Sequence, residues 1–193
     1  MPRYVLTGAP GAGKTAILRL LERAGHQVIE EAATDVIALE QSLGSPEPWM
    51  SPGFADAIVT LQRQREERVS DGPVVSDGTV VSSGAIFVDR SPVCTLALAR
   101  HMRMPVSARL QAEVDRVVAG RCYAEVFFVR NLGFIERTAA RRISLADALA
   151  FEALHEQTYR ELGFELVEVP AGALPARAAL VCAAAGLPAL DLG

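Results

Sequence analysis

Hydrophobic residues recur along this chain in two alternating spacings, one typical of strands and the other typical of helices. Short apolar runs stand at residues 4–6, 27–29, 85–88, 126–129 and 164–169. Between these runs, hydrophobic positions recur every three or four residues, as they do on the buried face of a helix. An alternation of this kind predicts βα units, and therefore a parallel sheet with helices on both faces.

The helical segments carry recognisable start and stop signals. After the first strand, Ile17 and Leu21 belong to an apolar stripe at helical spacing. Ser144 and Asp147 resemble a capping box, which predicts a helix that begins there and continues to about Leu162. The other expected helices cover residues 34–42, 54–69, 92–102, 108–118 and 174–185.

The stretch between the second and third core strands contains two less regular segments. The end of the third expected helix is densely charged over residues 62–68, which predicts a solvated face. Residues 74–81 hold two short β-like runs around a turn signal, and they could form either a hairpin or a loop. The run at 85–88 leads directly into Asp89, so we expect it to be the third core strand.

Composition is that of an ordinary globular domain, and we expect residues 1–193 to form a single one. The formal net charge of −4 argues against a general nucleic-acid-binding surface. The 3 cysteines include no C-x-x-C pair, which favours a reducing compartment over a disulfide framework or a zinc site. No apolar run is long enough to span a bilayer, and no secretion signal is evident. We therefore expect a cytoplasmic protein without a membrane partner.

The most specific motif stands between the first strand and the first helix. Residues 8–15 read G-A-P-G-A-G-K-T and match the P-loop pattern G-x-x-x-x-G-K-[ST]. In such a loop the backbone N–H groups and the helix N-terminus surround a phosphate. We expect Lys14 to reach the β- and γ-phosphates of ATP, and the Thr15 hydroxyl to bind Mg²⁺. The residues expected to bind the nucleotide are Gly8, Ala9, Pro10, Gly11, Ala12, Gly13, Lys14, Thr15 and Ala16.

Carboxylates at the ends of two predicted strands are candidate catalytic groups. Asp89 follows an apolar strand as a Walker B aspartate does, and we expect it to bind Mg²⁺ together with Thr15. The neighbouring Arg90 is a candidate for contact with the substrate. Glu31 ends the second strand and could accept a proton from a substrate hydroxyl. Glu30 is its alternative, because strand alternation turns only one of the two toward the cleft.

Simpler structural roles remain open for these groups. Asp89 could be a turn residue at the end of its strand, and Glu31 a charge at the start of the next helix. Arg130, Arg137, Arg141 and Arg142 form a further cluster. Arg137 and Arg141 are four apart and would share a helix face, where they could neutralise charge on a transferred phosphoryl group. A solvated basic loop is the alternative.

Together these motifs resemble the AAA_28-type group of P-loop domains, which includes the ribosylnicotinamide kinase domain of the bacterial NAD regulator. The similarity covers residues 3–15, 28–33, 87–90, 137–142 and 159–170. The resemblance implies a P-loop, nucleoside-kinase-like fold with a five-stranded parallel sheet and an arginine-bearing lid at about 130–143. It also implies that Glu31 and Asp89 line the reaction cleft. The segment 72–84 looks longer than the usual path into the third strand of this family.

Two classes of function fit these features. The first is a kinase that transfers the γ-phosphoryl group of Mg-ATP to a small hydroxylated, nucleoside-like acceptor. The second is a regulatory ATPase, a nucleotide-dependent switch that binds a protein partner. The catalytic residues expected for the kinase are Lys14, Glu31, Asp89, Arg137 and Arg141. Glu31 and Arg90 would contact the acceptor, and Arg137 would also contact the nucleotide.

Overall fold

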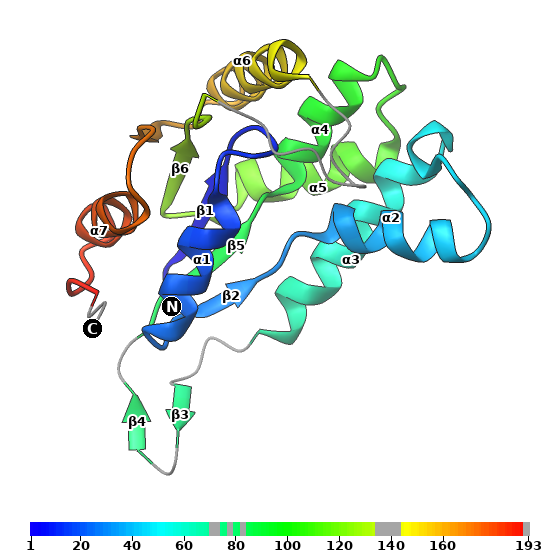
Figure 1. Ribbon diagram of the computed structural model, residues 1–193. Helices are drawn as coiled ribbons and strands as arrows, with labels where there is room; N and C mark the ends of the chain where they lie inside the picture. The colour runs from blue at the N-terminus through cyan, green and yellow to red at the C-terminus, as the bar shows by residue number, and fades with distance from the viewer. Residues whose placement is uncertain (70–73, 77–78, 82–83, 134–143, 191–193) are drawn as a thin grey trace.

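A five-stranded parallel sheet is the centre of the computed structural model of this chain (Figure 1). The structure describes residues 1–69, 74–76, 79–81, 84–133 and 144–190. The strands of the sheet are β1 (Arg3–Thr7), β2 (Gln27–Ile29), β5 (Ile86–Asp89), β6 (Glu125–Val129) and β7 (Leu166–Val169). Their order across the sheet is β2-β5-β1-β6-β7. The parallel α/β fold expected from the sequence pattern is confirmed.

Helices occupy the segments between the strands. They are α1 (Lys14–Arg23), α2 (Ala32–Ser42), the 3₁₀ helix η1 (Pro48–Met50), α3 (Phe54–Arg68), α4 (Pro92–His101), α5 (Ala108–Ala119), α6 (Leu145–Glu161) and α7 (Leu174–Ala184). The expected helix boundaries agree with these to within about two residues. None of the described helices combines the length and the apolar character needed to cross a bilayer.

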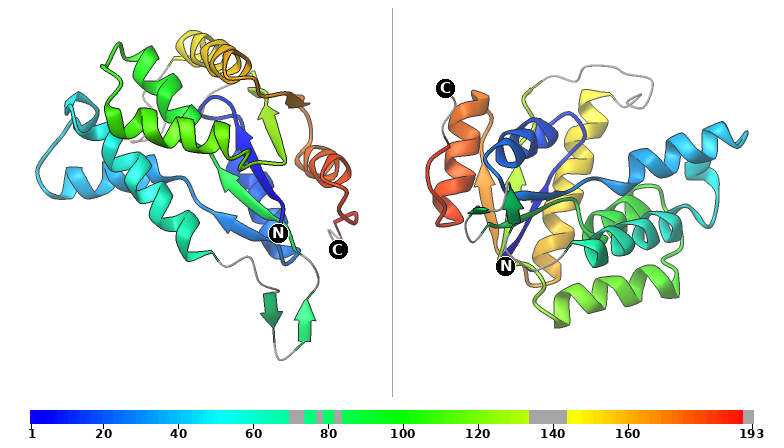
Figure 2. Two further views of the ribbon diagram at one scale, coloured as in Figure 1. Left: turned by 180° about the vertical axis from the view of Figure 1, so that it is seen from behind. Right: turned by 90° about the horizontal axis from the view of Figure 1, so that it is seen from below.

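The two faces of the sheet are covered by different helices, as Figure 2 shows. Leu6 of β1 packs with Ile17 of α1 and Val181 of α7 in one core cluster. The preceding residue of the strand, Val5, points to the other face and packs with Val93 of α4. Because strand side chains alternate in this way, one short apolar strand supplies both cores. The carboxyl ends of the strands are left to position polar residues.

The segment that could form a hairpin or a loop contains a hairpin. Strands β3 (Val74–Ser76) and β4 (Thr79–Val81) pair antiparallel, with Val75 opposite Val80. The pair extends away from the main sheet (Figures 1 and 2). The following β5 pairs with both β1 and β2, so the third core strand is where the sequence pattern predicted it.

The expectation of a solvated face over residues 62–68 is wrong for one side of that segment. Gln62 and Glu66, four residues apart on α3, are both buried. The Glu66 carboxylate is 2.8 Å from Arg116 Nη2 of α5 and accepts a hydrogen bond from the Tyr123 hydroxyl at 3.4 Å. A charge in the interior needs such partners, and composition alone does not reveal them.

Candidate active site

The P-loop joins the end of β1 to the start of α1 through backbone conformations that favour glycine. Gly8, Gly11 and Gly13 have φ angles of 126°, 81° and 82°, in the range that favours glycine. A Cβ atom at Gly8 would lie 2.3 Å from the carbonyl oxygen of Val129, so this part of the loop packs directly on the end of β6. The glycines are therefore required by geometry at the point where the loop turns toward the N-terminus of α1.

Lys14 lies inside this loop. Its side chain is only 6% exposed, and Nζ donates to the carbonyl oxygens of Gly8 at 3.1 Å and Ala9 at 3.0 Å. Burial, together with the nearby positive charge of Arg90, lowers the pKa of Lys14 to about 8, although Asp89 and other neighbours favour the charged form. Lys14 is also the only lysine in the chain. Its ammonium group is thus held close to the backbone of the loop, where an anionic ligand would stabilise its charge.

Asp89 is the last residue of β5 and lies next to the end of β1. It is 4% exposed and accepts a hydrogen bond from the Thr15 side chain. Burial, and to a lesser degree the neighbouring Glu31, raises its pKa, while Lys14 and Arg90 oppose the rise. These contacts bring together the two residues that the sequence pattern assigned to Mg²⁺.

The pair of Thr15 and Asp89 fits a magnesium ion. Asp89 Oδ1 is buried and has no hydrogen-bond partner in the described part of the chain. A carboxylate oxygen of this kind is a suitable ligand for Mg²⁺, which usually binds one or two carboxylates and keeps several waters. Across the described ranges, no group of three or more His, Cys, Asp or Glu residues could hold a metal by itself. The donors therefore suit an ion that is shared with a phosphate rather than one enclosed by protein.

Arg90 turns sharply out of β5. Its φ angle is 71°, a left-handed conformation that is uncommon for a residue with a side chain. The backbone N–H of Arg90 still donates to Leu6 at 3.1 Å, and the next residue, Ser91, begins α4 by accepting from the N–H of Val93 at 3.2 Å. A strand, one left-handed residue and a helix cap thus follow directly on one another. This turn directs the guanidinium group back over the P-loop, where Nη1 donates to the Gly8 carbonyl at 3.2 Å.

Glu31, rather than Glu30, faces the P-loop. Glu31 Oε1 is 2.5 Å from Arg90 Nε, and the Thr34 hydroxyl donates to its other oxygen at 3.1 Å. Burial favours the neutral form of Glu31, but Arg90 and then Lys14 outweigh it, so the pKa of Glu31 is lowered. The Glu30 side chain is 54% exposed. Both residues follow the last residue of β2, Ile29, and Glu30 pairs with Arg19 at the surface.

The backbone at this pair of glutamates is held by α3. Arg65 Nη1 donates to the carbonyl oxygens of Glu30 at 3.0 Å and Glu31 at 2.7 Å. Arg65 also forms an ion pair with Asp35 of α2. The charged end of α3 thus fixes the junction at which β2 ends and α2 begins.

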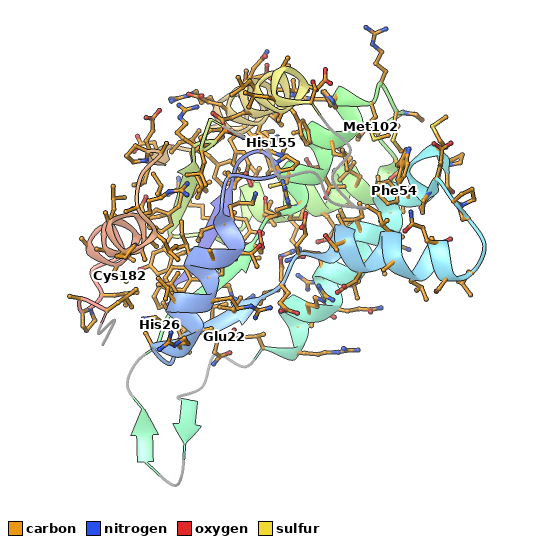
Figure 3. All side chains as sticks on the ribbon, in the orientation of Figure 1. Glu22, His26, Phe54, Met102, His155 and Cys182 are labelled. Carbon is orange, nitrogen blue, oxygen red and sulfur yellow. The ribbon has the colours of Figure 1, made fainter. Side chains whose placement is uncertain are left out.

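Two residues of α6 belong to the site but were not predicted from the sequence. His155 is fully buried, with Nε2 3.5 Å from Arg90 Nη1, and Figure 3 shows it on the side of α6 that faces the P-loop. One turn later, the Tyr159 hydroxyl is 2.6 Å from the Ser91 hydroxyl. The available signal was the spacing of Phe151, His155 and Tyr159 at four-residue intervals, which predicts one buried stripe.

The arginines of the proposed lid divide into two groups. Arg137, Arg141 and Arg142 lie outside the described residues. Arg130 is engaged in ion pairs with three carboxylates. Those carboxylates belong to Glu152, Glu156 and Glu168.

Arg177 of α7 is a further residue that was not predicted. It donates to the Arg130 carbonyl at 3.1 Å, and a Cβ atom at Gly13 would lie 2.9 Å from its Nη1. Arg177 therefore borders the P-loop from the side of α7. Its surroundings in the sequence are mostly alanine and leucine, and they gave no signal of this position.

Solved structures with the same fold were found by structural comparison. NadR in complex with NAD and AMP-PNP superposes with a TM-score of 0.69 and 16% identity, over 100% of this chain and 51% of NadR. A second NadR structure, in complex with NR, has a TM-score of 0.58 and 15% identity over 87% and 43% of the two chains. The present chain thus spans about half the length of NadR.

A third structure matches over its whole length. Deoxyadenosine kinase from M. mycoides, with dCMP and dCDP bound, has a TM-score of 0.61 and 13% identity over 95% of this chain and 98% of the kinase. At these identities the likeness is one of fold, and the fold is that of P-loop nucleoside kinases. A comparison with proteins of curated function found no match.

The sequence also matches a family model. That model, described as an AAA domain, covers residues 3–177. The match includes every described site residue discussed above, from the P-loop to Arg177. The chain therefore belongs to the AAA_28 family of P-loop domains.

Proposed function

We propose that this protein is a kinase that transfers the γ-phosphoryl group of Mg-ATP to a hydroxyl group of a small, nucleoside-like acceptor. The observation that carries the proposal is the ion pair between Glu31 and Arg90 beside Lys14 and Asp89. Binding a triphosphate and a metal requires only the P-loop, Thr15 and Asp89. Binding and orienting an acceptor would require a further charged pair, and Glu31 with Arg90 provides it.

On the nucleotide side, the backbone of residues 8–16 would bind the phosphates and Lys14 would contact the β- and γ-phosphates. Thr15 and Asp89 would hold Mg²⁺, which when bound neutralises charge on the phosphates. The presence of AMP-PNP in the similar NadR structure supports ATP as the donor. Arg137 would contact the nucleotide, and with Arg141 it would approach the transferred group.

On the acceptor side, Glu31 would accept the proton of the attacking hydroxyl or hold that hydroxyl in line. The acceptor oxygen forms a bond to the γ-phosphorus, the bond to the β–γ bridging oxygen breaks, and ADP leaves. The lowered pKa of Glu31 keeps the carboxylate ionised and ready to accept a hydrogen bond. Arg90 would orient the carboxylate and contact the acceptor. A nucleoside-like acceptor is supported by the deoxynucleotides bound to deoxyadenosine kinase.

The test is a panel of acceptors with Mg-ATP. It contains ribonucleosides, deoxyribonucleosides, ribosylnicotinamide and simple sugars, and mass spectrometry detects any phosphorylated product. Glu31→Gln should lower kcat on the best acceptor by about 10²-fold or more, the usual range for a lost general base, and leave the Kd for Mg-ATP unchanged. Glu30→Gln is the matched control, because Glu30 is exposed and pairs with Arg19; it should change kcat by less than about twofold.

One result would contradict the kinase, and a second would contradict the role given to Glu31. One is ATP turnover that no acceptor stimulates but that a protein partner alters, which would favour the regulatory ATPase. The other is equal activity of Glu31→Gln and Glu30→Gln, which would remove Glu31 from the reaction.

A further inference from the structure

Arg90 is held at several points although its backbone is in a sparsely populated conformation. Glu31 binds its Nε side, the Gly8 carbonyl accepts from Nη1, and the same Nη1 is 3.5 Å from the ring of His155. Left-handed backbone costs free energy for a residue with a side chain, and at Arg90 these contacts offset that cost. Glu31 and Gly8 directly follow strands β2 and β1, and His155 reaches Arg90 from α6.

The hydrogen bonds of His155 determine its tautomer. Nδ1 is 2.9 Å from the carbonyl oxygen of Phe151, and a carbonyl can only accept, so Nδ1 carries the proton. Nε2 then has a free lone pair, and it faces an arginine, which can only donate. The contact between His155 and Arg90 is therefore a hydrogen bond from the guanidinium group to a neutral ring.

The groups around His155 favour this neutral state. Burial, and then Arg90, lower the pKa of His155 to about 3, against the opposing effect of the bond to Phe151. The positive charges of Lys14 in the P-loop and His101 of α4 lower it further. The Phe151 ring packs edge-on against the imidazole with centroids 4.1 Å apart, which fixes the plane of the ring.

We propose that His155 is a positioning residue for Arg90: its neutral ring, fixed on α6, accepts a hydrogen bond from the guanidinium group and holds it toward Glu31. The inference rests on the proposed function in one respect only: the proposed kinase activity is what assigns an acceptor to Arg90 and Glu31. The α6 helix supports the same turn at a second point, because Tyr159 contacts Ser91, the residue after Arg90. A single helix face thus fixes both residues that follow the strand-terminal aspartate.

The first experiment measures the tautomer and the pKa of His155 by long-range ¹H–¹⁵N NMR of the intact protein. We expect a proton on Nδ1 and no titration of His155 down to about pH 4. Arg90→Ala should shift the pKa of His155 upward by about one unit, because a neighbouring positive charge is lost. Arg100→Ala is the matched control: Arg100 of α4 also contacts α6, at Thr158 and Glu161, but it does not contact His155.

The second experiment measures the pKa of the Glu31 carboxyl by ¹³C NMR in two variants of His155. His155→Phe fills the space but provides no acceptor, so Arg90 should move more freely and the pKa of Glu31 should shift upward. His155→Gln restores an acceptor oxygen, and it should return the pKa of Glu31 to the wild-type value. If His155 served only for packing, the pKa of Glu31 would shift equally in both variants.

Several outcomes would overturn the positioning role. They are a proton on Nε2 of His155, titration of His155 near neutral pH, a His155 pKa that Arg90→Ala leaves unchanged, and equal Glu31 pKa values in His155→Phe and His155→Gln. None of these measurements uses an acceptor. Failure of the kinase assay and failure of the positioning role are therefore distinguishable.

Discussion

Burial controls the chemistry of the individual site residues as strongly as their charged neighbours do. Lys14 and Asp89 are both removed from water, so each one's charged state depends on the other and on ligands that bind between them. A buried lysine whose pKa is about 8 loses its proton within the pH range in which the protein can be studied. A phosphate ligand would favour the protonated form and raise this pKa again.

We therefore expect the affinity for Mg-ATP to fall as the pH rises above 8. Below that value Lys14 is already protonated in the free protein; above it, binding must take up a proton, which lowers the affinity by up to about tenfold per pH unit. Calorimetry in buffers of different ionisation enthalpy measures both the affinity and the proton uptake. NMR of ¹⁵N-labelled lysine measures the pKa of Lys14 directly.

Lys14→Arg is the control for this effect. An arginine stays charged throughout the range, so the pH dependence of its affinity should disappear. An affinity for Mg-ATP that stays constant from pH 7 to pH 9.5 in the wild-type protein would contradict the expectation.

The candidate site residues that could be proposed from the sequence are those that stand at the ends of strands. The P-loop, Asp89 and Glu31 each follow an apolar run, and parallel strands bring such positions to one edge of the sheet. His155 could not be found in this way, because its partner Arg90 is 65 positions away and α6 must pack before the two meet. The roles of Arg137 and Arg141 stay predictions.

At the scale of the elements, α3 is linked to the site through Arg65. The side chain reaches from α3 to two backbone carbonyls at the end of β2 and to Asp35 of α2. The N-cap residue of α2 is Glu31, so the direction of this carboxylate depends on how the junction is held.

Removing the Arg65 side chain should loosen this junction. Arg65→Ala should lower the free energy of unfolding by about 1–3 kcal/mol, because one exposed and one half-buried carbonyl lose a charged donor, and it should weaken transfer to the acceptor more than binding of Mg-ATP. Urea unfolding measures the first effect. Arg63→Ala removes only the exposed pair with Glu67, and its effect should be below about 0.5 kcal/mol. Equal losses in the two variants would show that the carbonyl contacts of Arg65 do not matter.

Helix boundaries were predictable where a cap determines them. Ser144 accepts a hydrogen bond from the N–H of Asp147 at 3.1 Å at the start of α6, and Gly163, with φ at 81°, follows its end.

The start of β7 was less predictable. Phe164 was expected to begin this strand, but it packs against the Tyr159 ring before the strand begins at Leu166. A hydrophobic residue in a loop that packs into the core looks the same in a sequence as the first residue of a strand.

At the scale of the whole molecule, the strand order brings the ends of β1, β2 and β5 together. The sequence predicted a parallel sheet with helices on both faces, but it revealed neither this strand order nor which helices share a face. Glu66 of α3 is buried because α5 lies against it, and that packing follows only from the assembled fold.

Binding of Mg-ATP at the P-loop and Asp89 should stabilise the whole fold. Mg-ATP at about 100 times its Kd should raise the free energy of unfolding by about 2.7 kcal/mol, and ATP with EDTA should raise it less. Asp89→Asn should remove most of this difference, because the carboxylate is a candidate ligand of the ion. Asp115→Asn, on the exposed side of α5, is the control, and it should keep the difference between Mg-ATP and ATP with EDTA. Thermal unfolding with each ligand measures the effect, and a metal-dependent gain that survives in Asp89→Asn would argue against this carboxylate.

The presence of a single lysine, placed in the P-loop, gives the molecule an unusual experimental property. Amine-directed acylating reagents can modify one lysine side chain only, apart from the α-amino group. The yield of that one adduct reports how far the loop is covered, without any engineered label. Competition between a reagent and candidate nucleotides would then rank donors by occupancy, even before an acceptor has been identified.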